Sequence, residues 1–498
     1  MIRSSFIVSV LAAFGSGVSF LGQLILARFF GAGAELDAYL VAISLPLTVA
    51  GLLGGILGYQ VVPALRREET AGGGADASLI AMLAGLGGST AVLAAAGIAF
   101  TPAVMGVMAH GLPAASLPLV EHVSVIAWTW LPLAVIGAIL TGGLHARHRF
   151  IFATLLQPLP AIGAMWGCLA GHQSRGVSSL AWGQLAGYLL MVALLATALR
   201  FRWQAPDWKQ TRHIFREVPL ALGALLVFVI YPLPDAIWGA QAGVAGVSLL
   251  GYAQRLIVGF AGLAVVGATT VLFPRLSQQA ADGAHQALQD DLARSLRIML
   301  ACMAPAAAAL GVLALPIVRF LFVRGAFGEP EAAALARLLP WMFGGMVAMS
   351  GMTLAFKALF ALGRVRQAAT FSLAGAGIYF VASALLVGPF GLSGIGAAYA
   401  LVWWVVLALA IRALGAASAA QGAFIGRLIL ITAFCGIIAW MGREIFLTDE
   451  CGRWTLAFAL AGVVMAAVAA FLAASFLWPG LDEVRFLAQG LRNKKAAR

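Results

Sequence analysis

Charge and cysteine are scarce in this sequence. Asp, Glu, Lys and Arg make up 10% of the 498 residues, while hydrophobic residues make up 62% and the mean hydropathy is +0.97. Soluble domains carry roughly 25% charged and roughly 45–50% apolar residues, so this composition excludes a soluble protein. The four cysteines show no paired spacing, which leaves no sign of a disulfide framework or a metal site. Most of the chain must therefore be solvated by lipid.

Long polar segments are also missing. The longest, residues 202–218 and 275–291, can lie on a membrane surface but cannot bury a core of their own. The first apolar run is too long for the core of a signal peptide and has no nearby cleavage signal, so we expect it to be retained. The sequence therefore predicts an all-α integral membrane protein without a soluble domain.

Apolar runs long enough to cross a bilayer recur along the whole chain. A membrane-spanning helix needs about 20 consecutive apolar residues. On this measure the sequence predicts fourteen transmembrane helices. They cover residues 5–30, 37–65, 78–106, 116–143, 150–171, 177–200, 214–238, 243–272, 293–322, 333–361, 367–388, 392–414, 422–441 and 452–478.

The basic residues predict the orientation. Lys and Arg collect in cytoplasmic loops because they resist translocation. If the N-terminus is cytoplasmic, most of the 31 Lys and Arg residues fall on that side, including Arg66, Arg147, Arg202 and Arg364. We therefore expect both termini in the cytoplasm. The net charge of +12 therefore indicates the orientation of the chain and some attraction to anionic lipid. It does not indicate nucleic-acid binding.

Two pairs of motifs indicate an internal repeat. GYQVVPALRR and TTVLFPRLSQ place Pro63 and Pro274 in the same relation to the end of a span, and GGLHARHRF resembles LFALGRVRQ around Arg147 and Arg364. The offsets are similar, so we predict two halves of about six helices in the same orientation. The last two helices then fall outside the duplication.

Charged residues inside or beside the spans are the candidate functional groups, because a lone charge in hydrocarbon costs about 2.5–3.5 kcal/mol on insertion scales. Arg28 and Asp37 lie at the junction of the first two spans, where they either mark the membrane interface or face protein, water or substrate. Arg255 is the best intramembrane cation. It suits contact with a phosphate or pairing with Asp235, which lies in YPLPDAIW just after two prolines that bend the helix. Gln23 and Gln60 either line a polar cavity or join helices.

Several segments carry a family resemblance. They are ARFFGAGAELDAYLVAISLP with QVVPAL, YAQRL followed by VLFPRLS, FLFVRGAF, FKALFALGRVR and GPFGLSGIGAAYAL. In order and spacing they resemble the MurJ/MviN family of lipid flippases, within the multidrug/oligosaccharidyl-lipid/polysaccharide exporter superfamily.

The resemblance implies the architecture and the activity. It implies an N-terminal lobe over residues 1–200, a C-terminal lobe over 201–415, and two final helices over 416–498 that form a lipid-holding groove. It also implies a flippase of the bacterial inner membrane that moves lipid II, the undecaprenyl-pyrophosphate-linked peptidoglycan precursor, to the outer leaflet. By alternating access, the lobes would open first inward and then outward. Cell-wall or polysaccharide synthesis proteins are the implied partners.

The sequence departs from the family where arginines are usual. Aligned on the GAG motif, the family's arginine and Arg-Asp positions in the first two helices are here Ser16, Gly22 and Gln23, and the region of Ala50 and Gly51. Arg28, Asp37, Asp235 and Arg255 carry over from the charged set. We therefore predict a substrate cavity containing Arg255, Asp235, Arg28, Gln23 and Gln60, and an outer gate in which Asp37 pairs with Arg28.

Other functions stay open at this point. The cargo is lipid II or another lipid-linked glycan of an exopolysaccharide or capsule pathway, and an ion-coupled drug exporter or a non-transporting homologue also fits. A membrane glycosyltransferase would need a large outer loop, and the predicted outer loops are short, so we do not expect an enzyme. No nucleotide-binding loop is visible. We expect no cofactor, and an ion gradient or the membrane potential as the driving force.

Overall fold

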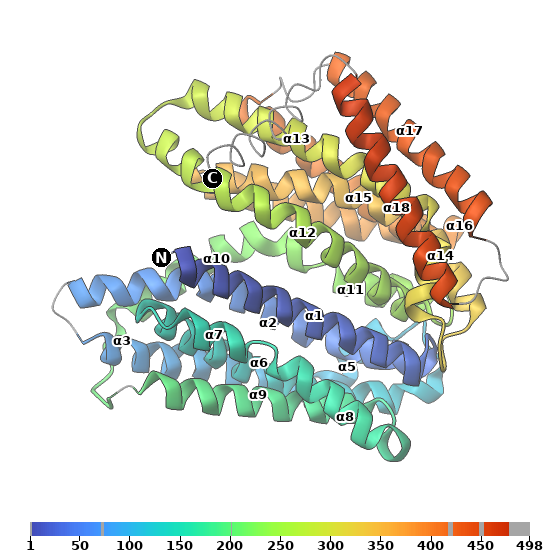
Figure 1. The fold of residues 1–498 in the computed structure, drawn as a ribbon. Coiled ribbons are helices and arrows are strands. Elements are labelled where there is room, and N and C mark those ends of the chain that lie inside the picture. The colour runs from blue at the N-terminus through green and yellow to red at the C-terminus, as the bar shows by residue number, and fades with distance from the viewer. Residues whose placement is uncertain (1, 71–73, 201, 417–421, 448–452, 478–498) are drawn as a thin grey trace. The chain divides into compact units, whose positions relative to one another are not determined.

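The chain folds almost entirely into helices. The computed structural model describes all residues except 1, 71–73, 201, 417–421, 448–452 and 478–498 (Figure 1). Across the described residues, the only strand-like pairing is a single bridge between Arg324 and Phe327. A backbone in hydrocarbon finds no water to bond, and a helix satisfies its polar groups within one segment. The predicted all-α class is confirmed.

The helices form two compact units, each with its own interior. The first comprises residues 1–251 and 324–327, and the second residues 252–323 and 328–498. Helix α12 (Gly246–Ala281) carries the chain from the first unit into the second. The predicted lobe boundaries at residues 200 and 415 stay a prediction. The other elements of the first unit are α1 (Ile2–Phe30), α2 (Ala34–Thr70), α3 (Ala75–Met82), the π-helix η1 (Leu83–Gly87), α4 (Gly88–Ala99), α5 (Thr101–Met108), the 3-10 turn η2 (Ala114–Ser116), α6 (Leu117–Ala146), α7 (Phe150–Leu156), α8 (Leu159–Arg175), α9 (Ser178–Leu199), α10 (Trp208–Val229) and α11 (Pro232–Gln241).

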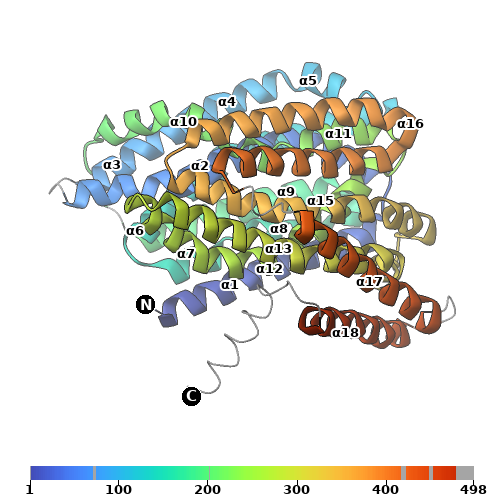
Figure 2. The same cartoon turned by 90° about the horizontal axis from the view of Figure 1, so that it is seen from above.

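The second unit contains the remaining helices. These are α13 (His285–Val312), α14 (Ala314–Phe322), α15 (Glu329–Ala361), α16 (Val365–Leu414), α17 (Gly422–Phe446) and α18 (Arg453–Leu477). Helices α17 and α18 pack side by side (Figures 1 and 2). Leu313 at the start of α14 is buried in one cluster with Ala439 of α17 and with Leu460 and Val463 of α18. The two helices predicted to follow the repeat are thus joined to this unit by apolar packing.

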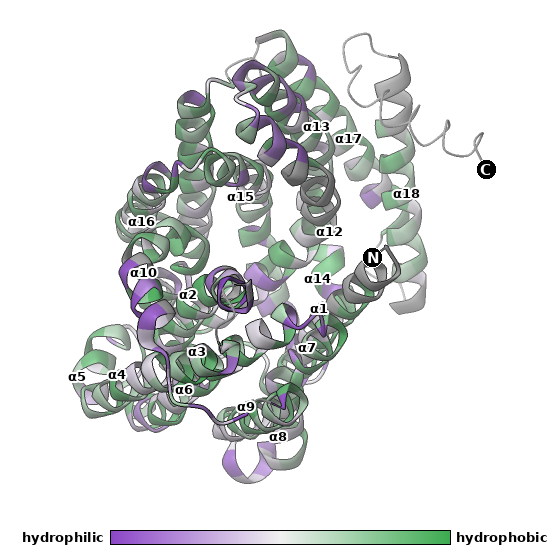
Figure 3. Cartoon of the chain, turned by 90° about the vertical axis from the view of Figure 1, so that its left-hand side faces the viewer, coloured by the Kyte–Doolittle hydropathy of each residue, from purple (hydrophilic) through white to green (hydrophobic). Residues whose placement is uncertain are grey.

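Each of the fourteen predicted spans falls on a helix or on consecutive helices. Among the described residues, ten helices are long and apolar enough to cross a membrane, and the bent pair Leu220–Val229 and Pro232–Gln241 makes an eleventh. Helix α16 has 50 residues and covers two predicted spans, while α12 and α18 cover the other two. Hydrophobic residues cover most of the helix shafts (Figure 3).

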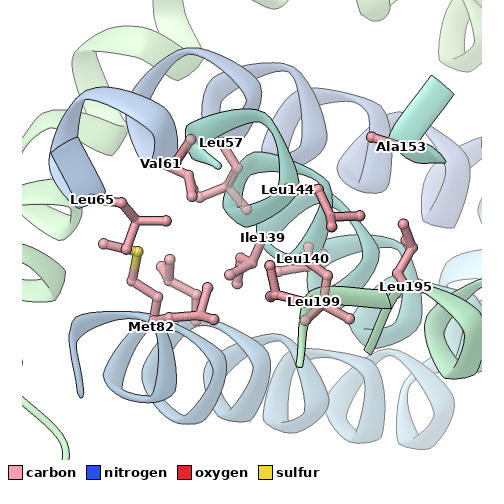
Figure 4. Close-up of a cluster of buried hydrophobic side chains, with 14 of the residues drawn as sticks. Leu57, Val61, Leu65, Met82, Ile139, Leu140, Leu144, Ala153, Leu195 and Leu199 are labelled. Atoms are coloured by element: carbon pink, nitrogen blue, oxygen red, sulfur yellow. The ribbon is translucent and has the colours of Figure 1, made fainter. Parts of the chain in front are cut away.

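The core of the first unit lies around α6, which packs against α2, α3 and α9. Leu57, Val61 and Leu65 recur every four residues along α2, so they share one helix face. That face meets α6, which also contacts α3 and α9 (Figure 4). The other buried side chains labelled in Figure 4 are Met82, Ile139, Leu140, Leu144, Ala153, Leu195 and Leu199.

Helices α8 and α9 meet through glycines. Gly163 and Gly167 of α8 face Gly183 and Gly187 of α9, each pair spaced by four residues. A Cβ on Gly163 would lie 2.9 Å from the Cα of Gly187, and one on Gly183 would lie 2.9 Å from the Cα of Gly167. Small residues at this spacing let two membrane helices approach backbone to backbone, where packing replaces the hydrophobic drive that lipid removes.

The predicted repeat is visible in the backbone. Gly176, between α8 and α9, has φ 52° and ψ −141°, and Gly391, inside α16, has φ 55° and ψ −137°. Arg200 at the end of α9 and Gly415 at the end of α16 are both left-handed, with φ of 48° and 69°. Each pair is separated by the same 215 residues, from 176 to 391 and from 200 to 415. Gly391 therefore breaks α16 at the position that separates α8 from α9.

Two arginines repeat the same hydrogen bond. The Arg149 guanidinium donates to the carbonyl oxygen of Ala198 near the end of α9 at 2.8 Å, and the Arg364 guanidinium donates to that of Ala413 near the end of α16 at 3.0 Å. A cation suits these positions because the last carbonyls of a helix have no intrahelical donors and carry partial negative charge. The two halves thus share side-chain chemistry as well as topology.

We predict that Gly391→Ala destabilises the protein by about 1–3 kcal/mol, because the observed φ and ψ are accessible to almost no residue except glycine. Thermal unfolding of the purified protein measures the loss. The control is Gly377→Ala in the same helix, where a Cβ meets nothing within 4 Å. It should leave the midpoint unchanged or raise it slightly. Equal midpoints for the two variants would contradict the prediction.

Candidate functional site

Residues 28–37 form a tight corner between α1 and α2, which we call the α1–α2 corner. Gly31 ends α1 in the left-handed conformation, with φ 64°, and its N–H donates to the carbonyl oxygen of Ala27 at 3.0 Å. This is the usual glycine C-cap of a helix. The Asp37 N–H donates to the carbonyl oxygen of Gly33 at 2.9 Å and closes the first turn of α2. The GAG motif is therefore the turn that sets the direction of α2.

Two acids in the first turn of α2 bind backbone N–H groups where other helices begin. Glu35 Oε1 accepts from the N–H of Val177 at 3.0 Å, just before α9. Asp37 Oδ1 accepts from the N–H of Ser248 at 2.7 Å, in the first turn of α12. The first N–H groups of a helix lack intrahelical acceptors and carry partial positive charge, so a carboxylate is a strong partner. Both acids act as helix caps supplied from a distant part of the chain.

A third segment docks on the same corner. The Ala326 N–H donates to the carbonyl oxygen of Arg28 at 2.9 Å, and Gly31 and Gly325 both hold left-handed conformations at the contact. A Cβ on Gly31 would lie 2.8 Å from the carbonyl carbon of Ala326. Phe327 is buried beside this contact. This explains why FLFVRGAF, far along the chain, carries a glycine followed by small and aromatic residues.

The corner gives Arg28 and Asp37 different surroundings. Asp37 is fully buried, whereas the Arg28 side chain is exposed and its guanidinium carbon lies 5.8 Å from the centre of the Phe29 ring. Within the described residues, no ion pair joins Arg28 to Asp37. The carboxylate predicted to pair with Arg28 is instead bound to Ser248. The gate role of Arg28 and Asp37 stays a prediction.

Asp235 lies where a span is broken. Helices α10 and α11 meet at Ile230 and Tyr231 with a bend of 42°, which confirms the predicted bend next to Pro232 and Pro234. Asp235 is buried in the first turn of α11, and its N–H donates to the carbonyl oxygen of Tyr231 at 3.0 Å. Pro232 and Pro234 occupy positions where a helix tolerates proline, because the first N–H groups have no intrahelical acceptor.

The other predicted site residues are spread over three helices. Arg255 is exposed on α12 and belongs to the second unit, while Asp235 belongs to the first, so their pairing stays a prediction. Gln23 of α1 and Gln60 of α2 are half-buried. Gln60 has interactions of its own within the chain. The structure assigns no role to these two amides.

Two glycines singled out in the sequence face neighbouring helices. A Cβ on Gly51 would lie 2.9 Å from Cγ1 of Val229 in α10, and one on Gly22 would lie 3.5 Å from Cγ of Met165 in α8. Ser16, by contrast, is exposed on α1. A larger side chain at Gly51 would therefore collide with α10, whereas Gly22 makes only ordinary contact with α8.

The far end of the first unit carries a second polar network, which we call the basic end. Arg147 forms an ion pair with Asp76 of α3 and donates to the carbonyl oxygen of Leu199. The second Asp76 oxygen accepts from the N–H of Arg202 at 3.0 Å. Arg66 contacts His148 at 3.1 Å. Sequence reasoning placed these arginines in one layer but missed Asp76, because the acid lies 71 residues from its arginine partner.

Glu35 and Ser248 were also missed. The only available signal for Glu35 was its place in the first helical turn, two residues before Asp37, where acids are favoured by the helix dipole. Ser248 contributes a backbone N–H to Asp37, and a backbone donor leaves no signature in the sequence.

Comparison with known proteins identifies the family to which this chain is similar. A family profile described as "Lipid II flippase MurJ" matches residues 26–474. The chain is 27% identical over 340 residues to the probable lipid II flippase MurJ of Rhizobium meliloti, covering 64% of this chain and 63% of that protein. It is 27% identical over 335 residues to the lipid II flippase MurJ of Burkholderia cenocepacia, covering 64% and 65%. In both matches the chain thus spans slightly less than two thirds of the relative.

Solved structures agree on the fold. The structure titled "Lipid II flippase MurJ, inward closed conformation" superposes with a TM-score of 0.81 at 18% identity, covering 96% of this chain and 99% of that one. An inward-facing multidrug resistance MATE family transporter of the MOP superfamily superposes with a TM-score of 0.66 at 14% identity, covering 84% and 99%.

These likenesses define the class, a multi-pass helical membrane protein with the fold that the MurJ and MATE structures share. Within that class the profile match covers most of the chain and includes the α1–α2 corner. The chain belongs to the MurJ family, as its sequence motifs predicted.

We predict that Asp37→Ala lowers the free energy of unfolding by about 1–2 kcal/mol, because the first turn of α12 loses its capping carboxylate. Asp37→Asn keeps a carbonyl oxygen as acceptor and should lose less. Arg28→Ala should leave stability unchanged, since the side chain is exposed. Thermal unfolding distinguishes the variants. If Arg28→Ala and Asp37→Ala were equally destabilising, an ion pair rather than the cap would hold the corner.

Proposed function

We propose that this protein is a flippase that moves lipid II from the inner to the outer leaflet by alternating access, and that it is a transporter rather than an enzyme. The observation that carries the proposal is the family profile over residues 26–474, with curated relatives named as lipid II flippases. The comparisons do not favour the alternatives, a flippase for another lipid-linked glycan or an ion-coupled drug exporter. The likeness to MATE transporters concerns the fold alone.

The cargo sets the physical requirements. A sugar and pyrophosphate headgroup must cross in a polar cavity while its polyprenyl tail stays in lipid. Arginine suits the pyrophosphate because its fork can donate two parallel hydrogen bonds to phosphate oxygens. We assign this contact to Arg255, exposed on α12, and propose Asp235, Arg28, Gln23 and Gln60 as further polar groups of the substrate path.

The gate follows from the α1–α2 corner. Asp37 bonds the start of α2 to the start of α12, which leads into the second unit. We propose that the Asp37–Ser248 bond forms when the transport path is closed at the α1–α2 corner and breaks when the path opens there. In the open state the exposed Arg28 side chain would pair with the released carboxylate. A buried charge needs a partner in both states, since an unpaired carboxylate in a low-dielectric interior is costly. In this proposal Asp37 and Arg28 form the ion pair of the gate only when the gate is open.

Location and organisation complete the proposal. The basic end of the first unit faces the cytoplasm, both termini are cytoplasmic, and the protein resides in a bacterial inner membrane. Its lobes comprise residues 1–200 and 201–415, followed by 416–498, which the 215-residue repeat between α8–α9 and α16 supports. An ion gradient or the membrane potential drives the cycle, and cell-wall synthesis proteins supply and consume the lipid.

Reconstitution tests the function. In vesicles holding the purified protein, lipid II added to one leaflet should become accessible to a headgroup-modifying reagent on the other side. Arg255→Ala should slow this by roughly ten- to a hundredfold, because a hydrogen bond to a charged group contributes about 1.5–3 kcal/mol. Arg255→Lys should fall between, since lysine lacks the fork.

The control is Arg175→Ala, an exposed cation at the end of α8 that the proposal does not use. It should transport at the wild-type rate. If no lipid-linked glycan moves while a cationic dye is pumped, the flippase proposal is wrong. If another undecaprenyl-linked glycan moves and lipid II does not, the assigned substrate is wrong but the protein is still a flippase.

A further inference from the structure

The first turns of α10 carry a stripe of basic side chains. Lys209, Arg212, His213 and Arg216 are all exposed, and their spacing of three, four and seven residues puts them on one helix face. We call these four residues the basic stripe. No described ion pair or hydrogen bond engages the side chains of Lys209, Arg212 and Arg216. The mechanism above does not use them.

The opposite face of the same turns is fixed to the protein. Thr211 and Ile214 are each 1% exposed, and Ile214 joins the apolar core of the first unit. Trp208 and Thr211 pack over Gly85 in the π-helix η1, where a Cβ would lie 3.1 Å from Trp208 Cζ3 and 3.0 Å from Thr211 Cγ2. Helix α10 therefore cannot turn to hide its basic stripe.

The segment before α10 is tied down as well. The N–H of Asp207 donates to the carbonyl oxygen of Ala77 at 3.2 Å, and the Asp207 carboxylate accepts from the N–H of Lys209 at 3.0 Å. Trp203, in the same segment, is 83% exposed. Hydrophilic residues gather over the start of α10 and the connection from α9 (Figure 3). A large exposed indole beside fixed cations is typical of a membrane interface.

The depth of the stripe matches lipid headgroups. In the sequence the apolar part of α10 begins at Val218, directly after Glu217, and Arg216 precedes it by two residues, about 3 Å at the helical rise. The headgroup region on each side of a bilayer is about 5–7 Å thick. Arg216 therefore lies within that region, and Arg212, about 9 Å before Val218, lies just beyond it. Long side chains with charged ends can reach phosphates from both positions.

We propose that the basic stripe and Trp203 form a binding surface for anionic phospholipid headgroups of the adjoining leaflet. Charge complementarity selects the partner, because three permanent cations on one fixed face meet a surface of phosphates. The attraction does not require the forked geometry of arginine. It falls with added salt, since exposed charges are screened within about 10 Å at 0.1 M ionic strength. The proposal is independent of which lipid-linked glycan is carried.

A label beside the stripe tests the proposal in the full chain. Ala205→Cys, an exposed position, is labelled with a fluorophore after Cys168, Cys302, Cys435 and Cys451 are replaced by alanine. The labelled protein is placed in vesicles containing brominated phosphatidylglycerol or brominated phosphatidylcholine. The anionic lipid should quench at least about threefold more effectively per mole, and 0.5 M salt should remove most of that difference.

Matched variants isolate the cations. Arg212→Gln with Arg216→Gln should bring the quenching ratio of the two lipids close to one. Arg175→Gln with Arg337→Gln also removes two exposed cations and should keep the wild-type ratio. Arg212→Lys with Arg216→Lys should keep it too, which maintains the test if the glutamine variant fails to fold.

Two results would overturn the proposal. One is a wild-type ratio in the folded glutamine variant, because the stripe would then not select the lipid. The other is quenching by aqueous iodide without quenching by either brominated lipid, because the surface would then face water or another protein. Neither result bears on lipid II transport, which the vesicle assay measures separately.

Discussion

The first unit depends on one electrostatic constraint: the N-terminal N–H groups of buried helices need acceptors where no water is at hand. Glu35 and Asp37 meet this need for α9 and α12 from the first turn of α2. The Ala326 N–H meets the carbonyl oxygen of Arg28 at the end of α1. A ten-residue corner thus gathers segments that begin near residues 177, 248 and 326. Because each bond joins a helix end, the corner fixes helix positions and not merely loop conformations.

At the opposite end of the same unit the charges are reversed, and arginines bind the C-terminal carbonyl groups of helices. Arginines there serve the carbonyl ends of helices, as Arg149 does for α9, and Arg364 repeats the arrangement for α16 in the second unit. Acids at helix starts and arginines at helix ends both follow the helix dipole. The left-handed residues at 176 and 391 recur with the same spacing. The two halves therefore share the features that end their helices.

The sequence predicted best those features that depend on interactions within a single segment. Fourteen apolar runs predicted the helices, since hydrocarbon solvation acts on each segment separately, and the two prolines near Asp235 predicted the bend between α10 and α11. The break in α16 was placed between residues 388 and 392, and Gly391 falls there. The offset of the repeat was approximate from motifs and became exact only from backbone conformation.

The candidate site was harder to predict, because its partners are distant in sequence. Asp37 was chosen for being a charge at a membrane edge, and its partner was sought nearby in Arg28. The acceptor–donor pair is instead Asp37 with a backbone N–H 211 residues away, a group that every residue except proline carries. Arg255 and Asp235 keep their assigned roles as proposals, since each is placed by a different unit.

The sequence by itself determined that the protein lies in lipid, roughly where its apolar helices fall, its family and its internal repeat, because each depends on local composition, spacing or motif. Tertiary structure alone decided which helix end each acid and arginine serves, and which helices meet at Gly22 and Gly51. Those outcomes depend on which backbones meet at 3 Å, and chain folding sets such distances between residues that no local pattern connects.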